Sequence, residues 1–432
     1  MIEPKLPTSV EDIDLSDVEF WSRPSEEREG AFVLLRRERP ISFHEEFDPP
    51  PEIPLPKGPG YWAVTRHADL LEVSRRADLF CSGKGSQIPD LPAELNEFFS
   101  SIISMDDPRH GRLRRIVSRG FTPKVLGQLE SDVRRRATAV IDAVIDKGEC
   151  DFVTEIAAPL PLGIICDLMG IPESQMNFVF EQTNIILGLG DPEYVVPGEN
   201  PLVAALTAGS ALSQLMNEVA ADHRQRPQDD LTSKLLNAEI DGEALNDQEL
   251  ASFFVLLVAA GNETTRNAIS HGMKALCDHP DERRKWAADF EGVASTAVAE
   301  IVRWATPVIH FRRTATRDTQ LGEQAIRAGE KVVLWYNSAN RDEAVFENPY
   351  RFDVTRMPNE HVGFGGPGAH FCLGASLARR EITVMFRELI RRLPDLTIVG
   401  EPDYLRSNFI HGIKRMPCSF TPGGAQSFSP AD

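Results

Sequence analysis

One cysteine lies in a loop whose composition suits a metal ligand. Residues 363–374 contain five glycines, and Cys372 stands just before an amphipathic helical pattern, LGASLARREITVMFRELIRRL. Glycine permits positive φ and lets the backbone approach a flat ligand closely. Unpaired N–H groups at the start of a helix would stabilise a thiolate and lower its pKa. The pattern predicts a thiolate ligand, which on a haem iron favours O–O cleavage. The alternative is a buried structural cysteine beside a turn.

A second pattern lies inside a long apolar segment. Residues 249–276 predict one buried helix with AGNETT at its centre. The hydroxyl of Thr264, three residues after Gly261, can compete for a backbone carbonyl and open the helix there. We interpret the opened helix as a groove for dioxygen at Ala260 and Gly261. In this interpretation Thr264 hydrogen-bonds the bound dioxygen and Glu263 relays protons from solvent. The alternative is a helix with an incidental Glu-Thr-Thr on its polar side.

A third pattern is the pair Glu300 and Arg303 in EIVRWATP. Residues three apart on a helix can pair across one turn. An exposed pair would contribute only about 0–1 kcal/mol, so the pair carries little information by itself.

These three patterns, in this order, resemble the cytochrome P450 family. The run F-G-x-x-G-x-H-x-C-x-G resembles its haem-binding signature, and AGNETT resembles its oxygen-activation motif. The resemblance makes Glu300 and Arg303 a buried structural pair that locks the meander at 340–356. One departure is that the family's usual Phe lies seven residues before the cysteine, where this chain has Gly365. Phe364 lies eight before, so the loop is one residue longer.

The resemblance implies haem b (iron protoporphyrin IX) on Cys372 and a monooxygenase activity that uses dioxygen. It extends from about Phe20 to Pro417 and is strongest to the bacterial methyl-branched lipid ω-hydroxylases. We therefore expect oxidation of a terminal methyl group of a branched or isoprenoid lipid. The related steroid side-chain monooxygenases are the alternative, with a cholesterol or cholestenone side chain as substrate.

Haem propionates need cationic or hydrogen-bonding partners. The resemblance places these at His110, Arg114, Arg313 and His370. The alternative for each is an ordinary surface cation.

Electrons must come from separate proteins, because no G-x-G-x-x-G nucleotide module and no cysteine cluster for iron and sulfur is present. The resemblance implies NAD(P)H, a flavin reductase and a ferredoxin. We expect the basic patch of Arg109, Arg112, Arg115 and Arg119 to dock an acidic donor.

Composition narrows the class of protein. The net charge of -19 argues against a nucleic-acid binder. The longest apolar run, Phe253 to Ala260, is too short to span a membrane, and the acidic N-terminus is not a signal peptide. Six cysteines without a C-x-x-C pair argue against a disulfide framework. We expect a soluble, cytoplasmic bacterial protein.

The predicted fold is mainly α with small β-sheets, in a single domain over residues 1–432. About residues 1–20 are expected to form a loosely ordered extension. Strands are predicted at 61–66, 331–340 and near Phe409, and helices dominate from 123 to about 303.

Apolar residues predict a dry pocket for a long or branched hydrocarbon, although core packing is the alternative for each. The candidates are Ile88, Phe98, Phe99, Ile102, Ile103, 184–190, Leu256, Ala260, Val308, Ile309 and Phe409.

Two rival hypotheses remain. A haem-based gas sensor or carrier would use the same ligand but would not need Glu263 and Thr264. A haem-free scaffold would leave the glycine loop unexplained.

Overall fold

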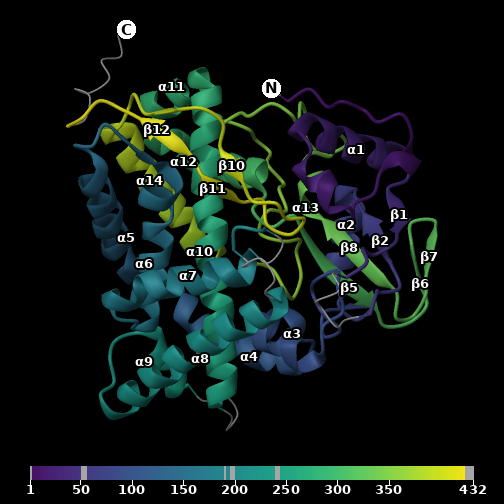
Figure 1. The fold of residues 1–432 in the computed structure, drawn as a ribbon, viewed down its shortest axis with the longest axis horizontal. Helices are drawn as coiled ribbons and strands as arrows, with labels where there is room; N and C mark the ends of the chain where they lie inside the picture. Colours follow the sequence, from purple (N-terminus) through teal and green to yellow (C-terminus); the bar gives the residue numbers. More distant parts are fainter. Residues whose placement is uncertain (1, 50–55, 189–190, 195–199, 239–243, 424–432) are drawn as a thin grey trace.

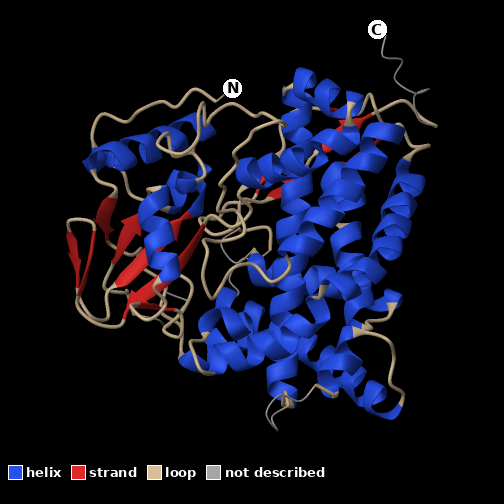
Figure 2. Ribbon diagram, turned by 180° about the vertical axis from the view of Figure 1, so that it is seen from behind, coloured by secondary structure: helices blue, strands red, loops and turns tan. Residues whose placement is uncertain are grey.

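Helices fill one side of the molecule, and a mixed sheet with its covering helices fills the other (Figures 1 and 2). The computed structural model describes residues 2–49, 56–188, 191–194, 200–238 and 244–423. This arrangement confirms the predicted fold class, mainly α with small β-sheets.

The helices alternate along the chain with strands and loops of varied length. They are α1 Ser25–Glu38, α2 His67–Arg75, α3 Ala93–Ser100, α4 Arg109–Ser118, α5 Pro123–Val144, α6 Pro159–Met169, α7 Met176–Leu187, α8 Pro201–Gln225, α9 Leu231–Leu236, α10 Asp247–Asp278, α11 Pro280–Ala288, α12 Phe290–Ala305, α13 Tyr336–Ala339 and α14 Ala375–Arg392. Single turns of 3₁₀ or π helix are η1 Val10–Asp12, η2 Val18–Ser22, η3 Ser101–Ser104, η4 Arg119–Phe121, η5 Val153–Ala157 and η6 Glu173–Gln175.

The strands form one larger sheet and several small ones. They are β1 Ile41–His44, β2 Tyr61–Val64, β3 Phe80–Cys81, β4 Glu149–Asp151, β5 His310–Ala315, β6 Thr319–Leu321, β7 Gln324–Ile326, β8 Lys331–Trp335, β9 Thr397–Ile398, β10 Asp403–Tyr404, β11 Ile413–Arg415 and β12 Pro417–Ser419. The five-stranded sheet has the order β1-β2-β8-β5-β3, with β2 parallel to β8 from Tyr61↔Lys331 to Val64↔Leu334. A second sheet has the order β4-β12-β9.

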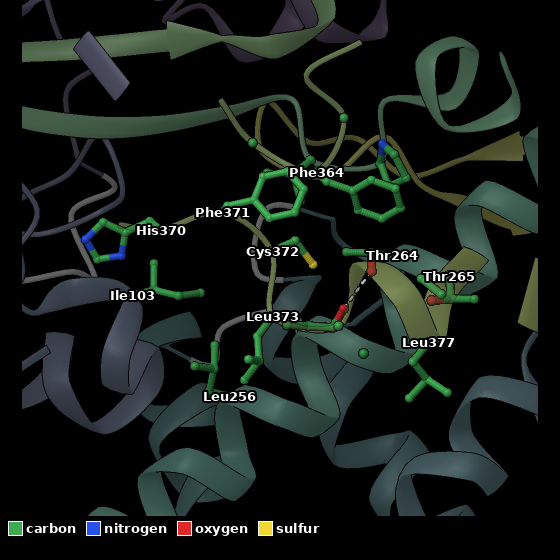
Figure 3. Close-up of a pocket in the computed structure, with 18 of the residues that line it drawn as sticks. Ile103, Leu256, Thr264, Thr265, Phe364, His370, Phe371, Cys372, Leu373 and Leu377 are labelled. Carbon is green, nitrogen blue, oxygen red and sulfur yellow. Dashed lines mark hydrogen bonds between the residues drawn. The ribbon is translucent and has the colours of Figure 1, made fainter. Parts of the chain in front are cut away.

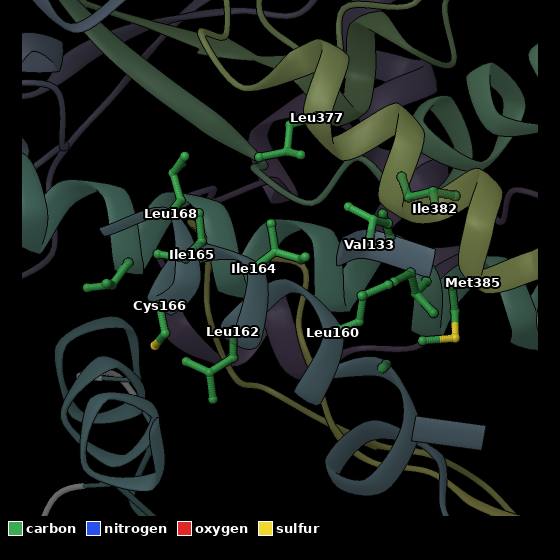
Figure 4. Close-up of a cluster of buried hydrophobic side chains, with 14 of the residues drawn as sticks. Val133, Leu160, Leu162, Ile164, Ile165, Cys166, Leu168, Leu377, Ile382 and Met385 are labelled. Carbon is green, nitrogen blue, oxygen red and sulfur yellow. The ribbon is translucent and has the colours of Figure 1, made fainter. Parts of the chain in front are cut away.

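The long helix α10 is the centre of the helical side. It begins with a capping box in which Asn246 and Glu249 satisfy each other's backbone N–H groups. Its residues are buried nearly all round, as the apolar run predicts, because α6, α8, α12 and α14 pack around it. Helix α6 is apolar except for Asp167 and fills the space between α5, α10 and α14 (Figure 4). This packing fixes α10 and α14 relative to each other.

Two sequence predictions differ from the structure. The N-terminal segment is not a loose extension, because Val10, Ile13 and Leu15 are buried in a core cluster with Trp335 of β8. Sequence spacing alone gave no sign of this partner, which lies more than 300 residues away. The strand predicted at 331–340 ends at Trp335, and the chain turns there into α13.

Candidate active site

The loop before α14 holds Cys372 in a fixed backbone setting. The N–H of Cys372 donates to the carbonyl of Phe364 at 3.0 Å, and the N–H of Gly365 donates to the carbonyl of Val362 at 2.9 Å. Gly365 has φ +85°, a conformation that favours glycine, and it accommodates the extra residue of this loop. Gly368 has φ +155°, and a Cβ there would lie 2.2 Å from the carbonyl oxygen of Ser74. The loop is therefore pressed against the end of α2.

The ring of Phe364 lies in the pocket lining although the loop is one residue longer than in the family's usual pattern. It lines the pocket beside Cys372, and the guanidinium of Arg379 lies 4.4 Å from its centroid. A cation over an aromatic face is attracted by the ring's quadrupole. Arg379 is one turn into α14, so this contact ties the loop to the helix.

Burial raises the pKa of the Cys372 thiol, against the prediction of a lowered value. The backbone N–H groups of Gly374 and Ala375, together with Arg114 and Arg379, act in the opposite direction, as expected for a helix start. Desolvation outweighs them because the sulfur lies in an apolar pocket. A thiolate here needs a cation at the sulfur, and a bound metal ion deprotonates a coordinating thiol outright.

The opposite wall of the pocket is α10. Figure 3 shows the sulfur of Cys372 pointing into the space in front of Thr264. The Oγ of Thr264 donates to the carbonyl of Ala260 at 2.6 Å, as the sequence predicts, while α10 stays continuously helical. Ala260, Gly261 and Thr264 line the pocket with small side chains. Because these side chains are small, the pocket between α10 and Cys372 has room for a flat ligand together with a small molecule.

Glu263 faces away from this pocket. Its side chain is 2% exposed, pairs with Arg266 one turn on, and accepts a hydrogen bond from Nδ2 of Asn267 at 3.0 Å. Its Oε2 has no partner among the described residues. Glu263 lines a separate small cavity with Asn184, Tyr194 and other residues. Glu263 and Thr264 thus lie on different faces of the same helix.

The four predicted propionate partners gather at the rim of the pocket. Arg114, Arg313 and His370 line it, and the ring of His110 packs at a tilt against that of His370, with ring centroids 4.3 Å apart. Within the described part of the chain, neither arginine has an ion-pair partner; Arg114 donates to the carbonyl of Phe371, and Arg313 to that of Arg312. Burial and the neighbouring cations Arg313, His110 and Arg114 lower the pKa of His370 to about 2.

These groups fit a haem. Buried Arg313 and half-buried Arg114 face the pocket without a carboxylate, and Nε2 of buried His110 lacks a hydrogen-bond partner among the described residues. A buried cation without an anion is costly, so the rim is complementary to two carboxylates of a ligand.

The apolar lining of the pocket includes some predicted residues and excludes others. Ile102, Ile103, Leu256, Ala260 and Val308 line it. The candidates outside the lining are Ile88, Phe98, Phe99, Ile309 and Phe409. Asn184, Leu187 and Gly188 line the cavity of Glu263 instead, and residues 189–190 lie outside the described residues.

Local geometry explains the exclusions. Val308 and Ile309 are neighbours at the entry to β5, so their side chains point to opposite sides and Ile309 joins the core near Trp335. The rings of Phe98 and Phe99 pack against Gly209 of α8. Phe409 packs on the rings of His310 and Phe311, and of these Phe311 reaches the pocket.

Sequence reasoning missed other lining residues. Phe253 and Leu257 of α10 line the pocket, and their helical spacing from Ala260 and Gly261 could have indicated them. Phe121 and Ile165 also line it, but they come from η4 and α6. No local pattern connects these two elements with Cys372.

The pair of Glu300 and Arg303 is fully buried and bidentate, with both N–O distances at 2.7 Å. Arg303 also donates to the carbonyls of Asn340 and Pro349 at 2.8 and 2.9 Å, and Arg356 donates to Glu300 at 3.1 Å. The structure therefore joins the pair to the segment 340–356 that leads into the cysteine loop.

The basic patch is smaller than expected. Arg109 makes two hydrogen bonds of 2.7 and 2.6 Å to Glu97 of α3, and Arg109 and Arg112 both pair with Glu249 at the start of α10. These two arginines hold elements of the fold together, whereas Arg115 and Arg119 are exposed.

The fold, the pocket around Cys372 and the cationic groups at its rim together suit a protein that binds haem. Residues 204–397 match the family described as Cytochrome P450. The chain is 50% identical over 424 residues to a methyl-branched lipid omega-hydroxylase of Mycobacterium tuberculosis, covering 97% of this chain and 96% of that protein. It is 42% identical over 377 residues to a steroid C26-monooxygenase of Mycolicibacterium smegmatis, covering 86% of each.

A solved structure gives the same result. A Mycobacterium marinum cytochrome P450 in complex with pseudoionone superposes with a TM-score of 0.90 at 46% identity, covering 96% of this chain and 99% of that one. The chain belongs to the cytochrome P450 family and is a monooxygenase. Among the described residues, no helix is both long and apolar enough to cross a membrane.

Proposed function

We propose that this enzyme hydroxylates a terminal methyl group of methyl-branched or isoprenoid lipids. The observation that carries the proposal is the apolar space between α10 and η3, lined by Ile102, Ile103, Phe253, Leu256 and Leu257. Such a lining suits a hydrocarbon and offers no polar group that would hold a substrate's interior. The relative named methyl-branched lipid omega-hydroxylase supports the same substrate class.

The residues around the pocket have distinct parts in this proposal. Cys372 would be the ligand of haem b, which when bound would supply the activation of dioxygen. Arg114, Arg313, His110 and His370 would hold its carboxylates by charge and hydrogen bonds. The small side chains at Ala260 and Gly261 leave space on the substrate side of the cofactor.

Thr264 would donate a hydrogen bond into the pocket, and Glu263 would deliver protons to it. The Thr264 hydroxyl can turn from the carbonyl of Ala260 to donate a hydrogen bond into the pocket. Glu263 can deliver a proton toward Thr264 only if its contacts with Arg266 and Asn267 loosen. Its unpartnered Oε2 is the atom that would take up a proton from the small cavity beside it.

The test is product analysis with a panel of branched lipids, straight fatty acids and steroids. We expect the methyl-branched lipids to shift the haem absorbance on binding and to give products oxidised at a terminal methyl group. Internal oxidation only, or no spectral response to any branched lipid at soluble concentrations, would refute the proposal.

Steroid side-chain hydroxylation is a second candidate, because the steroid C26-monooxygenase relative is 42% identical. A cholestenone side chain ends in the same branched group that a methyl-branched lipid presents. Higher kcat/KM for cholestenone than for branched lipids in the same panel would favour this candidate.

We further propose that electrons from NAD(P)H arrive through a flavin reductase and an acidic ferredoxin. Exposed Arg115 and Arg119 lie on and just beyond α4, the helix whose Arg114 contacts the cysteine loop. Reversal of both charges should raise the KM for ferredoxin and reduce its salt dependence. Reversal of exposed Arg134 on α5 is the control, and an equal effect of the two changes would count against this docking surface.

A further inference from the structure

Two cysteines face each other across the small sheet on the helical side. Cys150 of β4 and Cys418 of β12 are directly paired in the antiparallel register, between Asp151↔Pro417 and Glu149↔Ser419. Their sulfur atoms are 3.6 Å apart. The two residues are 268 positions apart in the sequence, so only the folded chain brings them together.

The geometry of this pair suits a covalent bond. Directly opposed residues of antiparallel strands have Cα atoms about 4.5–5.5 Å apart, which lies within the range of about 4.4–6.8 Å seen in disulfides. No other two cysteines of the described residues are in contact; Cys277, for example, donates to the carbonyl of Leu396. The two thiols also differ in access, because Cys150 is half-buried and Cys418 is 2% exposed.

We propose that Cys150 and Cys418 form a reversible disulfide when the protein meets a low-molecular-weight disulfide. The Cys150 thiolate attacks one sulfur of the small disulfide and forms a mixed disulfide with it. The S–S bond of the small disulfide breaks, and its other half leaves as a thiolate that takes up a proton. The Cys418 thiolate then attacks Cys150 and expels the second small thiol. Two protein thiols are oxidised and one small disulfide is reduced to two thiols, so atoms and electrons balance.

The order of the two steps follows from the environment. Contact with Cys150 and burial raise the pKa of the Cys418 thiol, so Cys418 is the poorer first nucleophile. The half-buried Cys150 can meet a reagent from solvent. The sulfur of Cys418, 3.6 Å from that of Cys150, can then attack it without a movement of the backbone.

The bond would join the end of the chain to its middle. β12 is the central strand of its sheet, with β9 on the other side. Just before β12, the carbonyl of Met416 accepts from the N–H of Phe152 at 2.9 Å, and Ile413 of β11 donates to Asn267 of α10 at 3.2 Å. A disulfide at Cys418 would therefore restrain the segment from β11 to β12, which contacts α10 at Asn267, the residue that donates a hydrogen bond to Glu263.

The experiment uses the full haem-loaded chain incubated with glutathione disulfide. Remaining thiols are then alkylated, and peptides are mapped by mass spectrometry without reduction. We expect one cross-linked peptide pair, Cys150 with Cys418, that disappears on treatment with dithiothreitol. We also expect the oxidised protein to melt roughly 2–5 °C higher than the reduced protein.

Matched variants separate this inference from general oxidation. Cys277→Ser should still form the cross-link, whereas Cys418→Ser should leave Cys150 joined to glutathione. Full alkylation of both cysteines in the folded wild-type protein, or a stable glutathione adduct on Cys150 without cross-link, would overturn the proposal. An unchanged melting temperature after cross-linking would overturn its stabilising role.

Discussion

Glu300→Gln should destabilise the protein far more than its small change in shape suggests. The two carboxylate oxygens of Glu300 accept five hydrogen bonds, two of them from Arg303 and the others from Arg356, Asn359 and the backbone of Asp353. Gln replaces one oxygen with an NH₂ group. Whichever way the amide is turned, at least two donors then face a donor instead of an acceptor.

The expected magnitude follows from burial. Both partners of the ion pair are 0% exposed, so Arg303 would keep a buried charge without its anion. Removal of one partner of a buried pair costs about 3–5 kcal/mol, equivalent to roughly 10²–10³-fold or more in the folding equilibrium. The free energy of unfolding and the rate of haem loss to an acceptor protein are the measurements, because the segment 340–356 leads to the cysteine loop.

The matched control is Glu291→Gln on the same helix. Glu291 pairs with Arg387 at 2.8 Å but is 77% exposed, and such pairs contribute about 0–1 kcal/mol. If Glu300→Gln lowered the free energy of unfolding no more than Glu291→Gln, the reasoning from burial would be wrong.

Three further predictions concern single side chains. Cys372→Ser should lose the absorbance typical of thiolate-ligated haem in the reduced, carbon-monoxide-bound protein, and an unchanged spectrum would contradict the assigned ligand. Thr264→Ala should lower product per dioxygen consumed by roughly tenfold and release hydrogen peroxide, whereas Thr264→Ser should keep most of the coupling. Burial lowers the pKa of His271 to about 4. Between pH 6.5 and pH 4 this histidine is therefore protonated in the unfolded chain but neutral in the folded protein, so the free energy of unfolding falls as the pH drops through this range. His271→Gln should reduce this loss by roughly 2–4 kcal/mol in guanidinium unfolding at pH 7 and pH 4, and an equally steep loss would contradict the assignment.

Much of the site follows from local patterns. The glycine loop, Cys372 and the start of α14 are contiguous, and the hydrogen bond from Thr264 to Ala260 lies within one helical turn. Periodicity also defines α10 to within two residues at either end of the predicted range. The orientation of Glu263 could have been anticipated, since Arg266 and Asn267 follow one turn later on the same face.

Other features depend on contacts between distant segments. Arg109 and Arg112 look like a free basic patch in the sequence, but Glu97 and Glu249 reach them from α3 and α10. Ile309 and Val308 are equally apolar, and only their register at β5 decides which one reaches the pocket. The raised pKa of Cys372 likewise comes from burial by elements that local sequence does not identify.

The pairing of early strands with late ones has a consequence for biosynthesis. β2 finds its parallel partner β8 only after residue 335 has been made, and β4 finds β12 only at residue 419. Until nearly the whole chain has left the ribosome, both early strands expose unpaired edges, and contacts of such long range form slowly. The pocket is completed equally late, because Cys372 and the start of α14 are made only after residue 370.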